Sequence, residues 1–281
     1  MQIGIMAKTF VRRTVEETLG AVAEHGIHCV QFSLTCAGVP DMPDSIAPGL
    51  CDRIRKAMKA HGIAMSAVSG TYNMAHPDPQ ERRRGLQRLR MLASVCDRLG
   101  ASVITLCTGT RDPGYMWRRH PANDSQEAWN DLVASMREAL QIAEEHKVML
   151  AFEPEVSNVV DSAVKGRRLL GEMRSPYLKV VMDPANIFHK GELPRMREII
   201  AEAFALLGDH IVLAHAKDLD HDGEAGHEAA GRGLLDYNQY LSLLGKAASD
   251  VPLILHGLSE SQVDGCVAFL KGKMAAVSKT P

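Results

Sequence analysis

Short apolar segments rich in β-branched residues alternate along the chain with longer segments of helical periodicity. In residues 128–147, apolar side chains recur at spacings of three and four, which is the pattern of an amphipathic helix. The apolar segments are nearly continuous, as expected for strands of a parallel sheet covered by helices. Eight such strands are predicted, at residues 3–7, 29–34, 64–69, 102–107, 148–153, 178–183, 211–216 and 252–256.

The junctions between helices and strands repeat. Gly26, Gly62 and Gly100 each stand between a helical segment and the next apolar run, and Lys147 takes the same place further on. A glycine there supplies the left-handed cap that ends a helix. Eight strand–helix units in one chain predict a single (β/α)8 TIM barrel spanning residues 1–281. A doubly wound sheet is the alternative, but neither a G-x-G-x-x-G nor a P-loop sequence follows the first strand.

Composition limits the classes of partner. A formal net charge of −2 does not favour a nucleic-acid partner. No apolar run approaches the roughly 20 residues that cross a bilayer, and the first ten residues do not resemble a secretory signal. The six cysteines form no C-x-x-C pair, which favours reduced, buried thiols. We therefore expect a cytoplasmic protein without a membrane partner.

Polar side chains stand where four consecutive predicted strands end. Glu153 and Asp183 close the fifth and sixth strands, His215 lies in the seventh, and His256 closes the eighth. In a TIM barrel these strand ends meet on one face, where the chemistry takes place. Carboxylate and imidazole ligands suit one divalent cation, with Mn²⁺ expected first and Mg²⁺, Co²⁺ or Zn²⁺ as alternatives. Lys217 offers the other interpretation, a salt-bridge cluster without a metal.

Four motifs resemble one superfamily. They are "AFEPE" at 151–155, "VVMDPANIF" at 180–188, "AHAKD" at 214–218 and "GRGLLDY" at 231–237. In this order they resemble the sugar isomerase/epimerase superfamily of xylose isomerase-like TIM barrels, which also contains endonuclease IV. The resemblance covers essentially the whole chain. It implies a metal held by Glu153, Asp183, His215 and a side chain of the eighth strand, and an enzyme acting on a small carbohydrate.

The chain departs from the superfamily pattern at two positions. Asn186 stands where a histidine commonly follows the aspartate of the sixth strand, and His256 stands where the eighth strand commonly ends in glutamate. The resemblance implies proton exchange between two glutamates in the ketose epimerases. Here Glu153 is the expected general base and His256 the expected second proton carrier. The predicted activity is a metal-dependent isomerase or epimerase of a ketose, sugar phosphate or sugar acid, acting through an enediolate. A decarboxylase or lyase of a 3-oxo sugar acid is the alternative.

The loops after the strands offer candidates for substrate binding. Arginine suits a carboxylate or phosphate, and tryptophan suits the apolar face of a sugar. The predicted substrate-binding residues are Lys8, His76, Arg111, Trp117, Asn186, His189, Lys217 and Arg232. A non-catalytic sugar-binding barrel and an apurinic-site nuclease are the less favoured functions, since the charge balance and Asn186 argue against the nuclease. A homodimer or homotetramer is the expected assembly.

Overall fold

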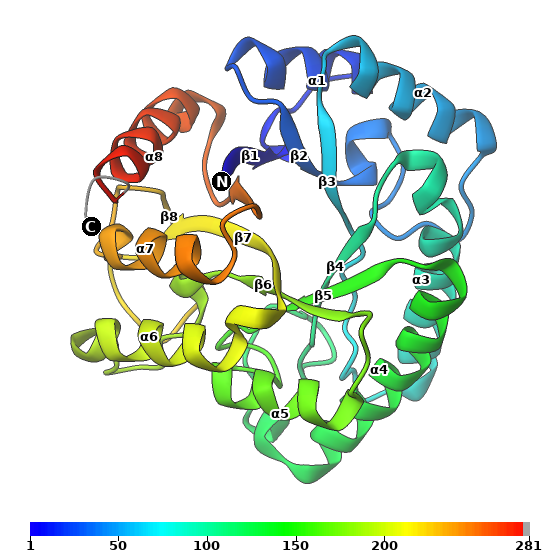
Figure 1. The fold of residues 1–281 in the computed structure, drawn as a ribbon. Helices are drawn as coiled ribbons and strands as arrows, with labels where there is room; N and C mark the ends of the chain where they lie inside the picture. Colours follow the sequence, from blue (N-terminus) through cyan, green and yellow to red (C-terminus); the bar gives the residue numbers. More distant parts are fainter. Residues whose placement is uncertain (278–281) are drawn as a thin grey trace.

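Eight parallel strands close into a cylinder in the computed structural model, which describes residues 1–277 (Figure 1). Each strand pairs with the next along the chain, and β1 pairs with β9 to complete the circle. The barrel strands are β1 (Gln2–Met6), β2 (Cys29–Phe32), β3 (Ala64–Ser69), β4 (Val103–Cys107), β5 (Met149–Glu153), β6 (Leu178–Met182), β7 (Ile211–Asp218) and β9 (Pro252–Leu255). The predicted TIM barrel is confirmed.

Helices surround the cylinder and follow its strands in turn (Figure 1). They are α1 (Val15–Glu24), α2 (Pro48–Ala60), α3 (Pro79–Leu99), α4 (Gln126–His146), α5 (Ala163–Met173), α6 (Met196–Leu207), α7 (Tyr237–Ala247) and α8 (Val263–Val277). Each helix buries one apolar stripe against the strands, as Leu132, Met136 and Ala143 do in α4. The periodicity of residues 128–147 thus predicted this helix correctly.

Left-handed backbone at the helix ends turns the chain into the next strand. Gly100 has a φ of 79° and ends α3, and Lys147 has a φ of 55° and ends α4. Each of these residues donates its backbone N–H to carbonyl groups of the last helical turn. The lysine pays a small steric cost that glycine avoids, because its Cβ crowds the backbone in this conformation.

The structure adds one strand that the sequence did not predict. β7 continues to Asp218, two residues past its predicted end, and pairs there with the short antiparallel strand β8 (Glu228–Ala229). This pairing forms a hairpin whose connecting loop comprises residues 219–227. The polar side chains of Lys217 and Asp218 masked this extension, because a polar pair normally marks the end of a buried strand.

A layer of apolar side chains fills the lower barrel. It takes one residue from each of the eight barrel strands and forms a cluster separate from the packing between strands and helices. The layer consists of Met6, Cys29, Ala67, Val103, Ala151, Val181, Leu213 and Ile254. Such layers make the interior of a TIM barrel a packed core rather than a pore. This one provides the apolar floor on which a site at the strand ends can stand.

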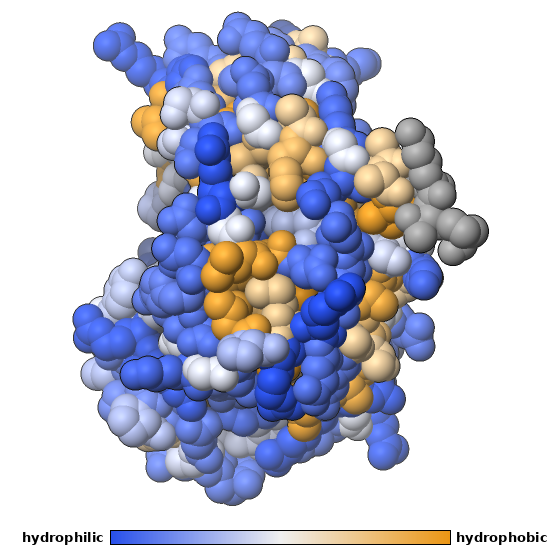
Figure 2. Space-filling view, turned by 90° about the vertical axis from the view of Figure 1, so that its left-hand side faces the viewer, coloured by the Kyte–Doolittle hydropathy of each residue, from blue (hydrophilic) through white to orange (hydrophobic). Residues whose placement is uncertain are grey.

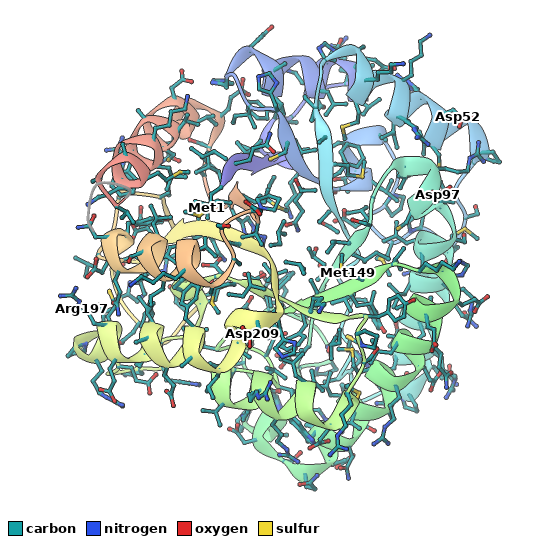
Figure 3. The ribbon with its side chains drawn as sticks, viewed as in Figure 1. Met1, Asp52, Asp97, Met149, Arg197 and Asp209 are labelled. Atoms are coloured by element: carbon teal, nitrogen blue, oxygen red, sulfur yellow. The ribbon has the colours of Figure 1, made fainter. Side chains whose placement is uncertain are left out.

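The outer surface is mainly hydrophilic. Charged side chains of the helices, including Asp52 of α2, Asp97 of α3 and Arg197 of α6, point away from the barrel (Figure 3). One face of the molecule shows a limited apolar patch surrounded by hydrophilic side chains (Figure 2). None of the helices within residues 1–277 is long and apolar enough to span a membrane.

Candidate metal and substrate site

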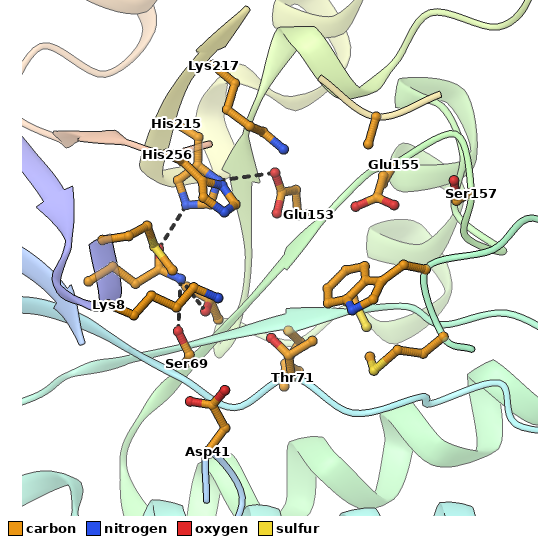
Figure 4. A pocket seen from close by; sticks show the side chains of 18 of the residues that line it. Lys8, Asp41, Ser69, Thr71, Glu153, Glu155, Ser157, His215, Lys217 and His256 are labelled. Atoms are coloured by element: carbon orange, nitrogen blue, oxygen red, sulfur yellow. Dashed lines mark hydrogen bonds and ion pairs between the residues drawn. The ribbon is translucent and has the colours of Figure 1, made fainter. Parts of the chain in front are cut away.

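The site begins one layer above the apolar floor. Side chains alternate between the two faces of a strand, so the residue two positions further along points the same way. Two positions beyond the eight floor residues stand Lys8, Gln31, Ser69, Thr105, Glu153, Asp183, His215 and His256. All are polar, and all but Asp183 line a cavity of about 690 Å³ at the carboxyl ends of the strands (Figure 4). A cavity of this size suits a small-molecule ligand.

Three potential metal ligands converge at one side of this layer. One donor atom each from Asp183, His215 and His256 lies within 4.8 Å of the other two. Glu153 adds a fourth, because its Oε1 lies 3.1 Å from His215 Nδ1. The His215 and His256 rings meet edge to face, with centroids 4.9 Å apart. The structure therefore brings together the four side chains that the sequence offered as metal ligands.

Two of these potential metal-ligand atoms have no hydrogen-bond partner. Among residues 1–277, five buried side-chain nitrogen and oxygen atoms lack one, and Asp183 Oδ2 and His256 Nδ1 are two of the five. Lys217 Nζ approaches Asp183 Oδ2 to 3.3 Å as an ion pair, without hydrogen-bond geometry. Leaving a buried polar atom unpaired costs free energy, so two such atoms in one site are well suited to hold a ligand. A divalent cation between them satisfies both.

The orientation of His215 supports the same conclusion. Gln31 donates its amide to Ser69 Oγ at 3.2 Å and to Thr105 Oγ1 at 2.9 Å, which turns its carbonyl toward His215. Nε2 of His215 lies 2.8 Å from that carbonyl oxygen and donates to it (Figure 4). With the proton on Nε2, Nδ1 of a neutral ring can offer its lone pair to a cation held beside Glu153 and Asp183, whose Oδ2 lies 3.8 Å away. A lone pair facing two carboxylates is the arrangement of a metal ligand with its outer partner in place.

Burial and charge act against each other in this cluster. Burial raises the pKa of Asp183, although the charge of Lys217 opposes the increase. Burial also works to raise the pKa of Glu153, but the interactions with His215 and Lys217 outweigh it and hold this pKa below its usual range. Burial and the nearby Lys217 lower the pKa of His256 well below its usual value, so its imidazole is neutral at pH 7. A neutral imidazole beside an ionised carboxylate is the form that binds a cation.

Glu155 is a second carboxylate in the cavity, and it was not among the residues predicted from the sequence. It is 5% exposed, and its Oε1 accepts a hydrogen bond from Asn158 Nδ2 at 3.3 Å. Figure 4 shows it beside Glu153, on the same side of the cavity. Burial, and next the charge of Glu153, raise its pKa to about 7. Its position two residues after Glu153 in "AFEPE" was the available signal.

Gln31, Ser69 and Thr105 were also missed. Each is a polar residue in or at the end of an otherwise apolar strand, and Gln31 interrupts "CVQF" in the middle of β2. Attention to charged residues and histidines at the strand ends overlooks such neutral residues. All three stand two positions after an apolar residue that points into the barrel, and this spacing identifies them.

Asn186 joins the site to the neighbouring hairpin. Its Nδ2 donates to Glu153 Oε1 at 2.7 Å, and its Oδ1 accepts from the backbone N–H of Gly226 at 2.9 Å. Both groups of its amide are thus engaged, and the side chain is fully buried. Asn186, which was predicted to bind substrate, thus contacts a candidate metal ligand.

The other predicted substrate residues fall into two groups. Lys8, Trp117 and Lys217 line the cavity. His76, Arg111, His189 and Arg232 are not among its lining residues.

Arg111 lies under the rim rather than in the cavity. It is 8% exposed, and its guanidinium donates to Asp131 Oδ2 at 2.6 Å and to Glu127 Oε1 at 2.9 Å, both on α4. The guanidinium therefore joins the loop after β4 to helix α4. His76 lies near the same loop, with its Nε2 3.3 Å from the carbonyl oxygen of Pro113.

Comparison with known proteins agrees with this architecture. A family model described as xylose isomerase-like TIM barrel matches residues 19–263. Among curated protein sequences, none matches the chain significantly.

Many solved structures share the fold. A D-tagatose 3-epimerase-like protein superposes with a TM-score of 0.78 at 14% identity, over 99% of each chain. A probable 3-DHS dehydratase, AsbF from Bacillus anthracis, gives a TM-score of 0.73 at 15% identity over 100% of each chain. The IolI protein, solved with a bound zinc atom, gives 0.73 at 16% identity over 99% of this chain and 98% of its own. At these identities the likeness establishes the fold.

Proposed function

We propose, because the chain belongs to the xylose isomerase-like TIM barrel family, that it is a divalent-metal-dependent isomerase or epimerase of a small carbohydrate. The observation that carries this proposal is the pair of buried atoms without a hydrogen bond, Asp183 Oδ2 and His256 Nδ1, next to Nδ1 of His215. Several structures of similar fold carry the names of sugar 3-epimerases, which supports the same reaction class.

Glu153, Asp183, His215 and His256 are the residues that would hold the cation. Their two carboxylates and two imidazoles suit Mn²⁺, Co²⁺ or Zn²⁺, and we expect Mn²⁺ first. When bound, such a cation polarises a substrate carbonyl and makes the neighbouring carbon more acidic. The two carboxylates would offset its double charge, with Lys217 as a further cation beside Asp183.

Two carboxylates stand ready to move protons at that carbon. Glu153 is the predicted general base, and its Oε1 is held by the Asn186 amide. Glu155 lines the same cavity and takes only a long hydrogen bond from Asn158, which leaves its carboxylate turned toward a ligand. We propose Glu155 as the second proton carrier, in place of His256, whose Nδ1 lies among the metal ligands. Exchange between these two carboxylates accounts for isomerisation or epimerisation without loss of carbon.

The remaining lining suits a polyhydroxylated substrate. Lys8, Asp41, Thr71 and Ser157 supply donors and acceptors around the cavity (Figure 4). Trp117 supplies an apolar surface on which a sugar ring can stack. The Lys8 and Lys217 ammonium groups suit a carbonyl, hydroxyl or carboxylate oxygen.

Incubation of the metal-loaded protein with a panel of ketoses, sugar phosphates and oxo sugar acids in D₂O tests the proposal. Deuterium incorporation at carbon, without carbon loss, is the expected result. The matched control is Asp183→Asn, which removes one charged ligand at similar volume and is expected to abolish exchange. Exchange that persists in the control, or in protein stripped of metal, contradicts the proposal.

The lyase alternative follows from the same cavity. Lys8 and Lys217 give the cavity two cationic groups, which suit the carboxylate of an oxo sugar acid that is released as CO₂. Release of CO₂ with little deuterium in the recovered substrate identifies the decarboxylase. Formation of an unsaturated product identifies a dehydratase.

A further inference from the structure

A second group of side chains that could hold a metal ion lies at the edge of the main cavity, apart from the four candidate ligands described above. It stands on the loop of residues 219–227, which joins β7 to β8. Donor atoms of Asp220, His221 and His227 lie within 4.8 Å of one another. The side chains of Asp220 and His221 are more than half exposed, whereas that of His227 is 25% exposed. The proposed reaction uses none of them.

Both imidazoles aim one nitrogen at the same oxygen atom. His227 Nε2 lies 2.7 Å from Asp220 Oδ1, and His221 Nδ1 contacts that oxygen as well. The two rings are 4.3 Å apart between centroids and inclined by 37°. Two nitrogens and one oxygen thus meet at a point that is open to solvent, where a cation can complete its coordination with water.

Hydrogen-bond acceptors also lie beside the second nitrogen of each imidazole ring. Glu224 Oε1 lies 2.9 Å from His221 Nε2 and 3.6 Å from His227 Nδ1, and the carbonyl oxygen of Ala225 lies 3.3 Å from that same Nδ1. With the protons on these far nitrogens, the near lone pairs face Asp220 and can bind a cation. An outer carboxylate that orients a ligand histidine in this way is a regular feature of metal sites.

The loop itself is anchored at its end. His227 donates its backbone N–H to Asp218 at 3.1 Å, and Gly226 donates to Asn186 Oδ1 at 2.9 Å. The backbone at the end of this loop is therefore fixed by hydrogen bonds. Glu224 and His227 also line the main cavity.

From this arrangement we infer that Asp220, His221 and His227 form a second cation site, one that binds a transition metal ion such as Zn²⁺, Co²⁺ or Ni²⁺. Two imidazoles and one carboxylate favour these ions over Mg²⁺ and Ca²⁺, which prefer oxygen ligands. The bound ion links the two ends of the loop and so fixes one wall of the cavity mouth. The inference does not depend on the proposed reaction, because binding is measured directly.

The experiment counts bound ions. Protein without a histidine tag is stripped of metal and titrated with Zn²⁺ against a chromophoric chelator, and the titration is repeated with Co²⁺, whose visible absorption reports its ligands. The His221→Ala and Asp220→Asn variants are expected to bind one equivalent fewer than the wild type. The control His28→Ala removes an exposed histidine from another face and is expected to bind as many as the wild type.

A main-site variant keeps the two sites apart. Asp183→Asn is expected to retain the equivalent that His221→Ala loses, and the double variant Asp183→Asn/His221→Ala to lose both. Equal stoichiometry in the wild type, His221→Ala and Asp220→Asn overturns the inference. The cluster is then a set of imidazole–carboxylate ion pairs only.

Discussion

Replacement of Gln31 by methionine tests whether the barrel wall prepares His215 for a metal. Gln31 accepts the Nε2–H of His215 at 2.8 Å, and methionine fills a similar volume without a comparable acceptor. In the variant, the tautomer with the proton on Nδ1 becomes the more stable one, because Nδ1 can donate to Glu153 Oε1, which lies 3.1 Å away. Metal binding must then displace that proton, so the variant is expected to lose metal affinity.

The structure sets the size of the effect. The change removes three buried hydrogen bonds of Gln31, of which only the one to His215 bears on the metal, and an unpaired buried group costs about 1–3 kcal/mol. At about 1.4 kcal/mol for each factor of ten, this corresponds to roughly a 10- to 100-fold weaker affinity, the range typical of outer-shell partners of ligand histidines. The metal-free protein should also lose some stability, because Ser69 and Thr105 lose the hydrogen bonds from Gln31, whereas the shifted His215 proton finds a new acceptor in Glu153.

Competition between the protein and a chromophoric chelator measures the affinity, and thermal unfolding of the metal-free protein measures the stability. Gln31→Glu is the matched control, since it keeps an acceptor for Nε2–H and should bind metal at least as well as the wild type. An affinity in Gln31→Met within twofold of the wild type refutes the reasoning. His215 would then be oriented by its other contacts alone.

Four further predictions concern the site and its supports. Glu153→Gln should lower kcat at least ~100-fold with unchanged circular dichroism, because it removes the general base and keeps the shape. Glu155→Gln should lower kcat with little change in metal affinity, and an equal loss of both would make Glu155 a ligand instead. Arg111→Leu should lower stability by about 2–4 kcal/mol in thermal or denaturant unfolding and leave KM unchanged, since its guanidinium is buried against Asp131. Burial raises the pKa of the Cys36 thiol to about 11, so its reaction with a thiol reagent should be slow at pH 8 and rise about tenfold per pH unit toward pH 11.

The fold was accessible from sequence because its signals are local. Each strand shows an apolar run, each helix a stripe of period 3.6, and the junctions show glycines such as Gly100. These patterns arise from burial and backbone geometry within a few residues, so one chain is enough to recognise them. The hairpin at β8 was missed because its two paired residues, Glu228 and Ala229, form too short a segment to show any period.

The use of individual site residues was less accessible. Arg111 suited an anionic substrate by residue type, but its partner Asp131 lies on a helix twenty positions away along the chain. Asn186 suited a ligand position by its spacing from Asp183, yet its amide joins Glu153 to Gly226. In each case the partner comes from another element, and only the packed structure decides which groups meet.

The layer above the apolar floor is chemically divided, and this division explains how the site is built. The arc from β2 to β4 contributes Gln31, Ser69 and Thr105, which are neutral, and the Gln31 amide donates hydrogen bonds to the two hydroxyl groups. The arc from β5 to β9 contributes the two acids and two imidazoles that converge on one point. Neutral hydrogen-bonding groups can fix a ligand's orientation without competing for the cation. Because the residue two positions below each of these side chains is apolar and buried, neither arc can relax into the barrel. The two arcs therefore act as support and ligand set, and the hydrogen bond between Gln31 and His215 is the contact through which they meet.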